Sequence, residues 1–534
     1  MFRYFLAEGP GLQQNEGFQE VFFLSRPGEF RRRFRGDEFA SALWNEHEYS
    51  LPSPVSRQGL PMKHLVLFPA AFLILLAANA LAAKPNILFI FADDMTFDHV
   101  AALGHGEVET PHLDRLVKGG TTFTHAYNPG SWSGAVCVAS RHMLMTGRQL
   151  WNAHKVANPK GMAQFHKAKT TWPQLLEGAG YKTYMSGKWH VKIGADKLFN
   201  VARHVRPGMP RSVKEAYNRP LEGKPDPWDP ADKSIGGFWE GGRHWSEVQA
   251  DDAVGFLQEA EKSEQPFFIY LAFNAPHDPR QAPQEFLDKY PANKVEIPKN
   301  FLPRYPFCNE IGNPHGLRDE NLAPMPRTKH SVRVHRREYY AIITHMDEQI
   351  GRVLDQLERS GKAKNTYVVF TADHGLAVGQ HGLFGKQNMY DHSVRVPFMV
   401  TGPGVAAGAA NAAPIYLQDI IPTSLDWAGA KTPEHVQFES IQPHLEGRGK
   451  KRDFVYGAYL GVQRSITADG YKLIYYPKAN HLLRLYKVSE DPHETTDLMK
   501  KGGPAVEAQV NRLWKRLQEV QGQFGDTLRL ERKK

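Results

Sequence analysis

The sequence runs Asn86-Ile87-Leu88-Phe89-Ile90-Phe91-Ala92 without a charge and then reaches two acids, Asp93 and Asp94. An unbroken apolar run of this length is typical of a strand buried on both faces, as in a parallel sheet. Thr110-Pro111 then predicts the start of a helix, and Gly119-Gly120 predicts its end. A buried strand followed by a helix indicates an α/β fold.

The same pattern occurs twice more along the chain. Residues 267–273 form an apolar run that leads into Asn274-Ala275-Pro276-His277, and residues 366–372 lead into Asp373-His374-Gly375. In open α/β sheets, ligands bind outside the carboxyl ends of the strands. We therefore expect the polar residues that follow the three strands to meet in one site.

A long helix and a smaller terminal region complete the predicted architecture. Apolar residues recur at helical spacing from Tyr339 to Leu357, which predicts a helix that faces the core. Residues 201–245 and 291–335 are rich in Pro, Gly and charge without periodicity, so we expect long loops on the substrate side. Short strand-like pieces and a terminal helix follow. The sequence therefore predicts a main domain over residues 84–431 and a smaller α+β subdomain over residues 432–534.

The segment before the main domain has the pattern of a secretory signal peptide, over residues 62–83. Met62-Lys63-His64 precede an uncharged run that ends in small residues, with cleavage expected near Ala82 and Ala83. We expect export to the periplasm or the medium, with an uncleaved membrane anchor as the alternative. Because a signal peptide begins a chain, residues 1–61 are interpreted as a disordered extension from a misassigned upstream start codon. The alternative is a genuine leader.

Composition restricts the class of protein and its partners. The chain has 534 residues, a formal net charge of +9 and two cysteines. Its length exceeds what one core usually fills, and two cysteines exclude a fold held by many disulfides. A basic exported protein suits an anionic substrate, although a generic basic surface has the same composition. No segment resembles a nucleic-acid-binding module, so we expect no nucleic-acid partner.

The pentapeptide Cys137-Val138-Ala139-Ser140-Arg141 resembles the formylglycine motif C-x-P-x-R of type I sulfatases, in which alanine is tolerated in the proline position. In that family the cysteine is oxidised to formylglycine (3-oxoalanine). The resemblance implies an alkaline-phosphatase-like fold, with a mainly parallel sheet flanked by helices. It extends over nearly all of residues 84–500, where further matching pieces occur in the family's order: Asn86 to Asp94, Thr110 to Asp114, Gly187 to His190, Ala275 to His277, Asp373 to Gly375, Gly385-Lys386 and Arg395 to Pro397.

The resemblance also implies a bound divalent cation. Its ligands would be Asp93, Asp94, Asp373, the side chain of His374 and an oxygen of the modified Cys137. Carboxylates at strand ends suit a hard cation, so Ca²⁺ is the expected ion. His374 offers a nitrogen where many family members have asparagine, which leaves Mg²⁺ and Mn²⁺ open.

Catalytic roles are implied for six residues: Cys137, Arg141, Lys188, His190, His277 and Lys386. Cys137, as hydrated formylglycine, would be the nucleophile. Arg141 would hold the modified side chain and help to neutralise the sulfate, a task that suits its fixed fork of donors. Ala139 departs from the usual proline, and this departure puts efficient conversion of Cys137 in question.

The remaining implied roles concern sulfate binding and proton transfer. Lys188 and Lys386 would bind sulfate oxygens and stabilise charge in the transition state. His190 would contact the formylglycine hydroxyl and help the aldehyde to return. His277 would protonate the leaving oxygen, with Lys386 as its partner or substitute.

These expectations describe an exported, metal-dependent sulfatase that acts on a sulfated carbohydrate or another sulfate ester, such as an aryl sulfate or choline sulfate. A formylglycine-generating enzyme or a radical maturase would convert Cys137. One alternative is a phosphodiesterase or phosphonate hydrolase of the same superfamily. The other is an unmodified, catalytically silent protein that binds sulfated glycans.

Overall fold

The structure is a computed structural model that describes residues 83–532. The predictions for residues 1–61 and for the signal segment up to residue 82 lie outside the described residues. Within the described range, no helix combines the length and the apolar character that a membrane crossing requires.

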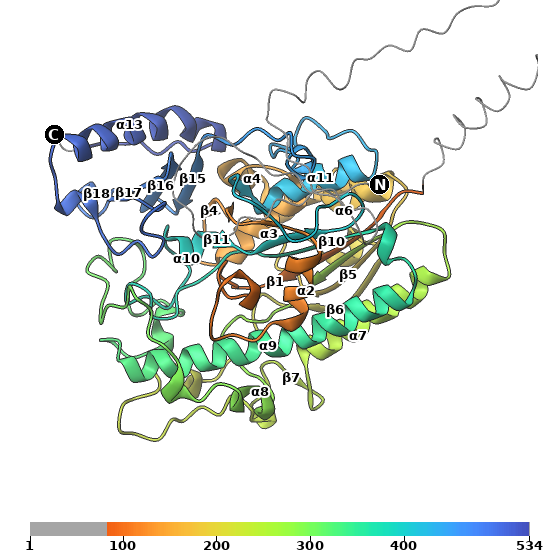
Figure 1. The fold of residues 1–534 in the computed structure, drawn as a ribbon, viewed down its shortest axis with the longest axis horizontal. Helices are drawn as coiled ribbons and strands as arrows, with labels where there is room; N and C mark the ends of the chain where they lie inside the picture. The colour runs from red at the N-terminus through yellow and green to blue at the C-terminus, as the bar shows by residue number, and fades with distance from the viewer. Residues whose placement is uncertain (1–82, 533–534) are drawn as a thin grey trace, which may run out of the picture. The chain divides into compact units, whose positions relative to one another are not determined.

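A central sheet of eight strands organises the chain, in the order β13-β2-β12-β10-β1-β9-β5-β6 (Figure 1). Its strands are β1 (Asn86–Ala92), β2 (Thr121–Phe123), β5 (Lys182–Lys188), β6 (Val201–Arg206), β9 (Phe267–Ala272), β10 (Thr366–Ala372), β12 (Phe398–Thr401) and β13 (Ala409–Asn411). All pairs are parallel except those that β12 makes with β10 and β2. The predicted mainly parallel α/β sheet is confirmed.

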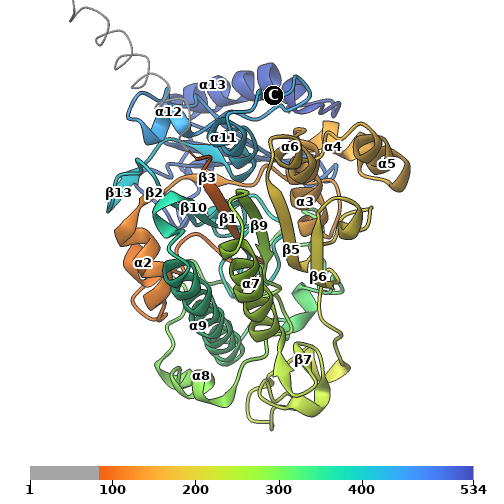
Figure 2. The same cartoon turned by 90° about the vertical axis from the view of Figure 1, so that its right-hand side faces the viewer.

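Helices cover both faces of this sheet (Figures 1 and 2). One layer contains α2 (Pro111–Gly119), α7 (Trp245–Glu261) and α9 (Lys329–Arg359), and the other contains α3 (Val136–Thr146), α6 (Trp172–Gly178) and α11 (Ile420–Trp427). Every residue of β1 is buried, and Phe89 meets Trp172 of α6 edge to face at 5.1 Å between ring centroids. Burial on both faces explains why β1 has no alternation of polar and apolar residues.

The predicted strands agree closely with the structure, but both predicted loops are wrong in part. The strands at residues 86–92 and 366–372 have the predicted bounds, and β9 ends one residue earlier than predicted. The loop predicted over residues 201–245 is wrong at its start, because β6 pairs there with β5 at the edge of the central sheet. The loop predicted over residues 291–335 is wrong at its end, because α9 already begins at Lys329. Thr328 caps this helix by accepting a hydrogen bond from Ser331 N at 3.0 Å.

The C-terminal region has its own antiparallel sheet, with β15 (Val455–Tyr459), β16 (Gln463–Ala468), β17 (Tyr471–Tyr476) and β18 (Leu482–Tyr486), and a terminal helix, α13 (Pro504–Val520). A fifth strand, β4 (Gly130–Ser131), lies beside β15 and comes from the segment just before Cys137. The other short elements are β3 (Ala126–Tyr127), β7 (Trp239–Glu240), β8 (Arg243–His244), β11 (Arg395–Val396), β14 (Ile415–Tyr416), α4 (Leu150–Val156), α5 (Pro159–Lys167), α8 (Gln284–Asp288), α10 (Asp391–Val394) and α12 (Gln442–Leu445). The boundary at residue 432 stays a prediction.

Gly187, next to Lys188 at the end of β5, leads to the first testable prediction. Its φ is +98°, and a Cβ built there would lie 1.9 Å from the carbonyl oxygen of Ala272. We expect Gly187→Ala to lower the free energy of unfolding by about 3 kcal/mol, measured in urea, because strain and a backbone clash add. Gly180→Ala is the matched control, since Gly180 has φ +94° and no atom within 4 Å. Equal losses from both variants would contradict the clash argument.

Candidate active site at the ends of the parallel strands

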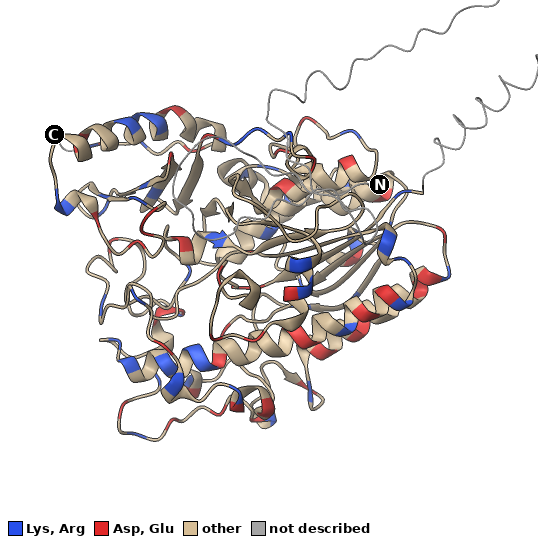
Figure 3. Cartoon of the chain, viewed as in Figure 1, with Lys and Arg blue, Asp and Glu red and all other residues tan. Residues whose placement is uncertain are grey.

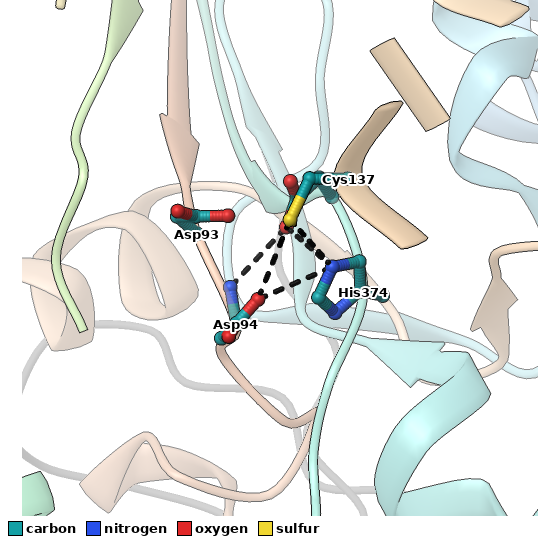
Figure 4. Close-up of side chains that lie close together, drawn as sticks. Asp93, Asp94, Cys137 and His374 are labelled. Carbon is teal, nitrogen blue, oxygen red and sulfur yellow. Dashed lines mark hydrogen bonds and ion pairs between the residues drawn. The ribbon is translucent and has the colours of Figure 1, made fainter. Parts of the chain in front are cut away.

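Five of the predicted residues come together where β1 and β10 end. Asp93 and Asp94 follow β1, Asp373 and His374 follow β10, and Cys137 lies in the first turn of α3. One potential ligand atom from each of the five lies within 4.8 Å of the others, and all five side chains are buried. Figure 4 shows the sulfur of Cys137 turned toward Asp94 and the imidazole of His374.

The loop after β1 contains a residue in the left-handed conformation, and side chains from other elements hold its backbone by hydrogen bonds. Asp94 has φ +67°, and its N–H donates to Asp373 Oδ1 at 3.2 Å. The Tyr339 hydroxyl of α9 donates to the Asp94 carbonyl at 2.7 Å and accepts from Thr96 N at 3.2 Å. Sequence periodicity placed Tyr339 in the core and missed this contact. In the sequence, the one indication of this contact was that Tyr339 is a phenol among the mainly aliphatic core positions of the helix. A buried hydroxyl needs a hydrogen-bond partner.

The Cys137 sulfur is surrounded by cations. Sγ lies 3.2 Å from Lys188 Nζ, 3.5 Å from Lys386 Nζ and 3.2 Å from His374 Nε2. Burial opposes ionisation of this thiol, but the two lysines and His374 outweigh it and hold the pKa of Cys137 well below its usual value. Position 137 is therefore a place where a negative charge or an electron-rich oxygen is stabilised.

Arg141 lies one helical turn after Cys137, so both side chains share a face of α3. Its Nε donates to Asp373 Oδ2 at 3.2 Å, and its Nη1 donates to the carbonyl of Lys188 at 2.9 Å. Arg141 is fully buried. This guanidinium thereby connects α3 to the ends of β5 and β10. The four-residue spacing between Cys137 and Arg141 allows this connection and the sulfur to lie on the same face of α3.

The acids and lysines of the cluster are paired with one another. Lys188 Nζ donates to Asp93, and Lys386 Nζ contacts both oxygens of Asp94, at 2.9 and 2.7 Å. Burial and the neighbouring Asp373 raise the pKa of Asp93. Burial acts the same way on Asp373, but His374 and Arg141 outweigh it and lower the pKa of Asp373. Burial opposes protonation of His374, yet the adjacent acids raise its pKa to about 8.

This donor set fits a divalent cation. Asp93 Oδ1 is buried, has no hydrogen-bond partner among the described residues and pairs only at 3.7 Å with Arg141 Nη2. A buried acceptor left without a donor is costly, and a cation at this position would satisfy it. Three carboxylates supply the hard oxygens that Ca²⁺ prefers, and His374 Nε2 lies 3.2 Å from Asp94 Oδ1. The cluster can therefore hold the ion that the sequence predicts.

Two histidines complete the predicted set. His277 Nε2 lies 3.2 Å from Lys386 Nζ, and its Nδ1 donates to the Asp278 carbonyl at 2.6 Å. Nε2 is thus the nitrogen that faces the site. His190 has φ +59° and lies beside the sulfur of Cys137, where burial lowers the pKa of its imidazole. A ring held neutral in this way can accept a proton.

Sequence analysis missed two polar residues that link His277 and Lys386 to the long loop after residue 291. Arg318 donates to Asp278, the neighbour of His277, and also pairs with Asp319. Asp319 in turn accepts from Gln387 Nε2 at 2.7 Å, next to Lys386. No motif marks these loop residues. The prediction of a loop at the site nevertheless agrees with their position.

Two family models match the chain. The model described as "Sulfatase" matches residues 85–430, and the one described as "N-sulphoglucosamine sulphohydrolase, C-terminal" matches residues 379–523. Together they cover the central sheet, the residue cluster and the C-terminal sheet.

Individual proteins are similar over most of their length. The N-acetylglucosamine-6-O-sulfatase of Bacteroides thetaiotaomicron is 26% identical over 541 residues, which cover 86% of this chain and 92% of that protein. A solved structure in complex with its substrate D-glucosamine-2-N,6-O-disulfate is 25% identical, with a TM-score of 0.64, over 84% of this chain and 100% of that one. The phosphonate monoester hydrolase of Agrobacterium radiobacter has a TM-score of 0.64 at 19% identity, over 83% of this chain and 96% of that one, and shares the fold.

Proposed function

The chain belongs to the sulfatase family and is a sulfuric ester hydrolase, and we propose that it is an exported enzyme that removes sulfate from a sulfated carbohydrate. The proposal includes a formylglycine formed from Cys137 and a bound divalent cation. The observation that carries it is the position of the Cys137 side chain, in contact with two lysines and within the group of three carboxylates and His374.

The proposal assigns a role to formylglycine and a role to the divalent cation. When present, formylglycine supplies the attacking oxygen as its hydrate, and the cation activates that oxygen and neutralises charge. Asp93, Asp94, Asp373 and His374 would hold the ion together with the modified position 137. Ca²⁺ is the proposed ion, with Mg²⁺ or Mn²⁺ as alternatives.

Binding of the sulfate falls to the cations around position 137. The Nζ atoms of Lys188 and Lys386 lie 3.2 and 3.5 Å from the sulfur, close enough to contact oxygens of a sulfate held there. Both lysines are buried, so their charges act in a medium that screens them weakly. Arg141, fixed by Asp373 and the Lys188 carbonyl, keeps α3 in register and adds a third positive charge.

Proton transfer requires a base near position 137 and an acid near the leaving group. His190 lies beside the Cys137 side chain with a lowered pKa, so it can take a proton from a hydroxyl at that position. His277 Nε2 and Lys386 Nζ are 3.2 Å apart, and either can give a proton to the departing alkoxide. Because Nδ1 of His277 is committed to the Asp278 carbonyl, the proton leaves from Nε2.

Support for the substrate and for export comes from different sources. The relative named N-acetylglucosamine-6-O-sulfatase and the complex with a disulfated glucosamine favour a sulfated sugar over a small aryl ester. Export is proposed from the signal-peptide pattern of residues 62–83. A formylglycine-generating enzyme or a radical maturase is the proposed maturation partner.

The proposed function is tested by comparing hydrolysis of 4-nitrophenyl sulfate, 4-nitrophenyl phosphate and a panel of sulfated oligosaccharides. We expect the sulfate ester to be hydrolysed at least about a hundredfold faster than the phosphate, measured as kcat/KM. We also expect one class of sulfated sugar to exceed the aryl sulfate. A preference for phosphate would favour a phosphodiesterase or phosphonate hydrolase. Binding of sulfated sugars without turnover of any ester would favour the silent glycan-binding protein.

A further inference from the structure

A cavity of about 410 Å³ lies at the beginning of α9. It is lined by His330, Val334, Arg337 and Glu338 of that helix and by the segment from Pro220 to Pro230. None of the residues proposed for catalysis or metal binding lines it. The cavity is therefore separate from the active site, and its size is suited to a sugar unit.

Positive charge collects on the first turns of the helix that forms one wall of this cavity. The helix begins Lys329-His330-Ser331-Val332-Arg333 and continues to Arg336 and Arg337 before its first acid, Glu338. Figure 3 shows Lys and Arg gathered on the first turns of α9, while acids gather along its second half and on α7. Such a segregated patch attracts an extended polyanion.

The charges that line the cavity differ in how they are paired. Glu338 and Asp226 both bind Arg219, and Asp229 accepts from Ala231 N at 2.9 Å. Within residues 83–532, Lys224 and Arg337 form no ion pair. Arg337 Nε donates only to the carbonyl of Leu287, at 3.3 Å. Two cations thus remain available to an incoming anion. Asp226 and Glu338 are paired with Arg219, whereas Asp229 has only a backbone donor and keeps its negative charge.

The cavity also has apolar walls. Pro220, Pro230, Leu287 and Val334 line it together with Trp228, which is 5% exposed. Sugar rings present C–H faces beside their hydroxyls, so they bury well against a mixture of apolar walls and polar groups. Gln284 and the carboxylates can accept from hydroxyls, and the free cations can pair with sulfate.

A short chain of contacts leads from the cavity toward the active site. Arg219, which binds Glu338 in the cavity wall, accepts a hydrogen bond at its carbonyl from His335 Nε2 at 2.9 Å. The His335 ring packs edge to face on Phe384, with centroids 5.1 Å apart, and Phe384 is two residues before Lys386. The cavity and the sulfate-binding lysine thus belong to one packed region.

We propose that this cavity binds a second sulfated sugar unit of a polysaccharide substrate, at a distance from the ester that is hydrolysed. The proposal rests on the proposed function, because it makes the natural substrate a polymer rather than an isolated sulfated sugar. Lys224 and Arg337 bind the sulfate of the distal unit, and the walls formed by Trp228 and Val334 contact its ring.

The test compares polymer and small substrates in two kinds of variant. Lys224→Gln/Arg337→Gln removes both free cations, and Val334→Trp fills part of the cavity without changing the charge. We expect each to weaken binding of heparin or iota-carrageenan, measured calorimetrically with the full chain at 0.15 M salt, by about tenfold. The kcat/KM for 4-nitrophenyl sulfate should stay within about twofold of wild type, which also shows that the variants fold.

Lys450→Gln/Lys451→Gln is the matched control, because it removes the same charge from two exposed lysines elsewhere. If the control weakens polymer binding as much, or if Val334→Trp has no effect, the cavity is not the binding site and the proposal is overturned. It is also overturned if the wild-type protein binds neither polymer. Failure to hydrolyse any sulfate ester would instead refute the proposed function, while the binding measurements would still decide the role of the cavity.

Discussion

Replacement of Cys137 by alanine is expected to lower kcat for sulfate-ester hydrolysis by about 10⁵-fold or more, the size of effect seen when a catalytic nucleophile is removed. The lysines and Arg141 remain in this variant, so sulfate binding should be retained and KM should change little. The measurement is steady-state hydrolysis of 4-nitrophenyl sulfate by protein made together with a maturation enzyme.

The same preparation tests the chemistry of position 137. Conversion of a thiol to an aldehyde should lower the mass of the wild-type peptide that contains residue 137 by about 18 Da. Cys308→Ala is the matched control, since Cys308 is also buried and free but lies outside the cluster. Full activity in protein whose Cys137 keeps its unmodified mass would show that formylglycine is not required. Ala139→Pro should increase the converted fraction if alanine limits maturation.

Removal of the divalent cation is expected to lower kcat/KM by about 10³-fold to 10⁴-fold, because the ion supplies several kcal/mol of charge stabilisation. Without it, Asp93 and Asp94 remain paired with Lys188 and Lys386 and compete with the sulfate for these two cations. Dialysis against EDTA should abolish hydrolysis, and Ca²⁺ should restore it. Comparison of Ca²⁺, Mg²⁺ and Mn²⁺ identifies the ion.

A second readout makes the metal prediction independent of activity. An ion that binds only the folded protein raises the thermal midpoint, so Ca²⁺ should stabilise the wild-type protein but not Asp93→Asn. Asp347→Asn is the control, because Asp347 is a buried carboxylate that binds the N–H groups of His112 and Leu113 instead. A Ca²⁺ response that Asp93→Asn retains in full would place the ion elsewhere.

The fold could be predicted where a single local pattern determines the structure. β1 and β10 are uncharged because both faces are buried, so each apolar run marked a strand to the residue. The start of α9 had no such pattern: Lys329 and His330 are exposed, whereas His335 and Arg336 are buried by contacts with distant segments. Those contacts, rather than apolar periodicity, place the first turns of the helix.

In the site, too, local motifs could be predicted from the sequence and contacts between distant segments could not. The motif pieces named Asp93, Asp94, Cys137, Asp373 and His374, and the structure brings the five side chains together. Their chemical roles stay predictions until the variants are measured. The supporting contacts could not be predicted, because they join segments far apart in the chain. The Tyr339 hydroxyl on the Asp94 carbonyl and Asn128 Nδ2 on the Asp373 carbonyl, at 2.6 Å, are examples.

The pairing of β4 with β15 has a consequence for the order of events during synthesis. Gly130 and Ser131 lie beside Ala458 and Tyr459, and the main chain on either side is joined by further hydrogen bonds. The segment that carries Cys137 therefore lacks its neighbouring strand until the ribosome has made the C-terminal sheet. At about 5–20 residues per second, this interval lasts roughly 15–60 s. Until then, the segment that leads into Cys137 cannot make its hydrogen bonds with β15, so this pairing is a late step of folding.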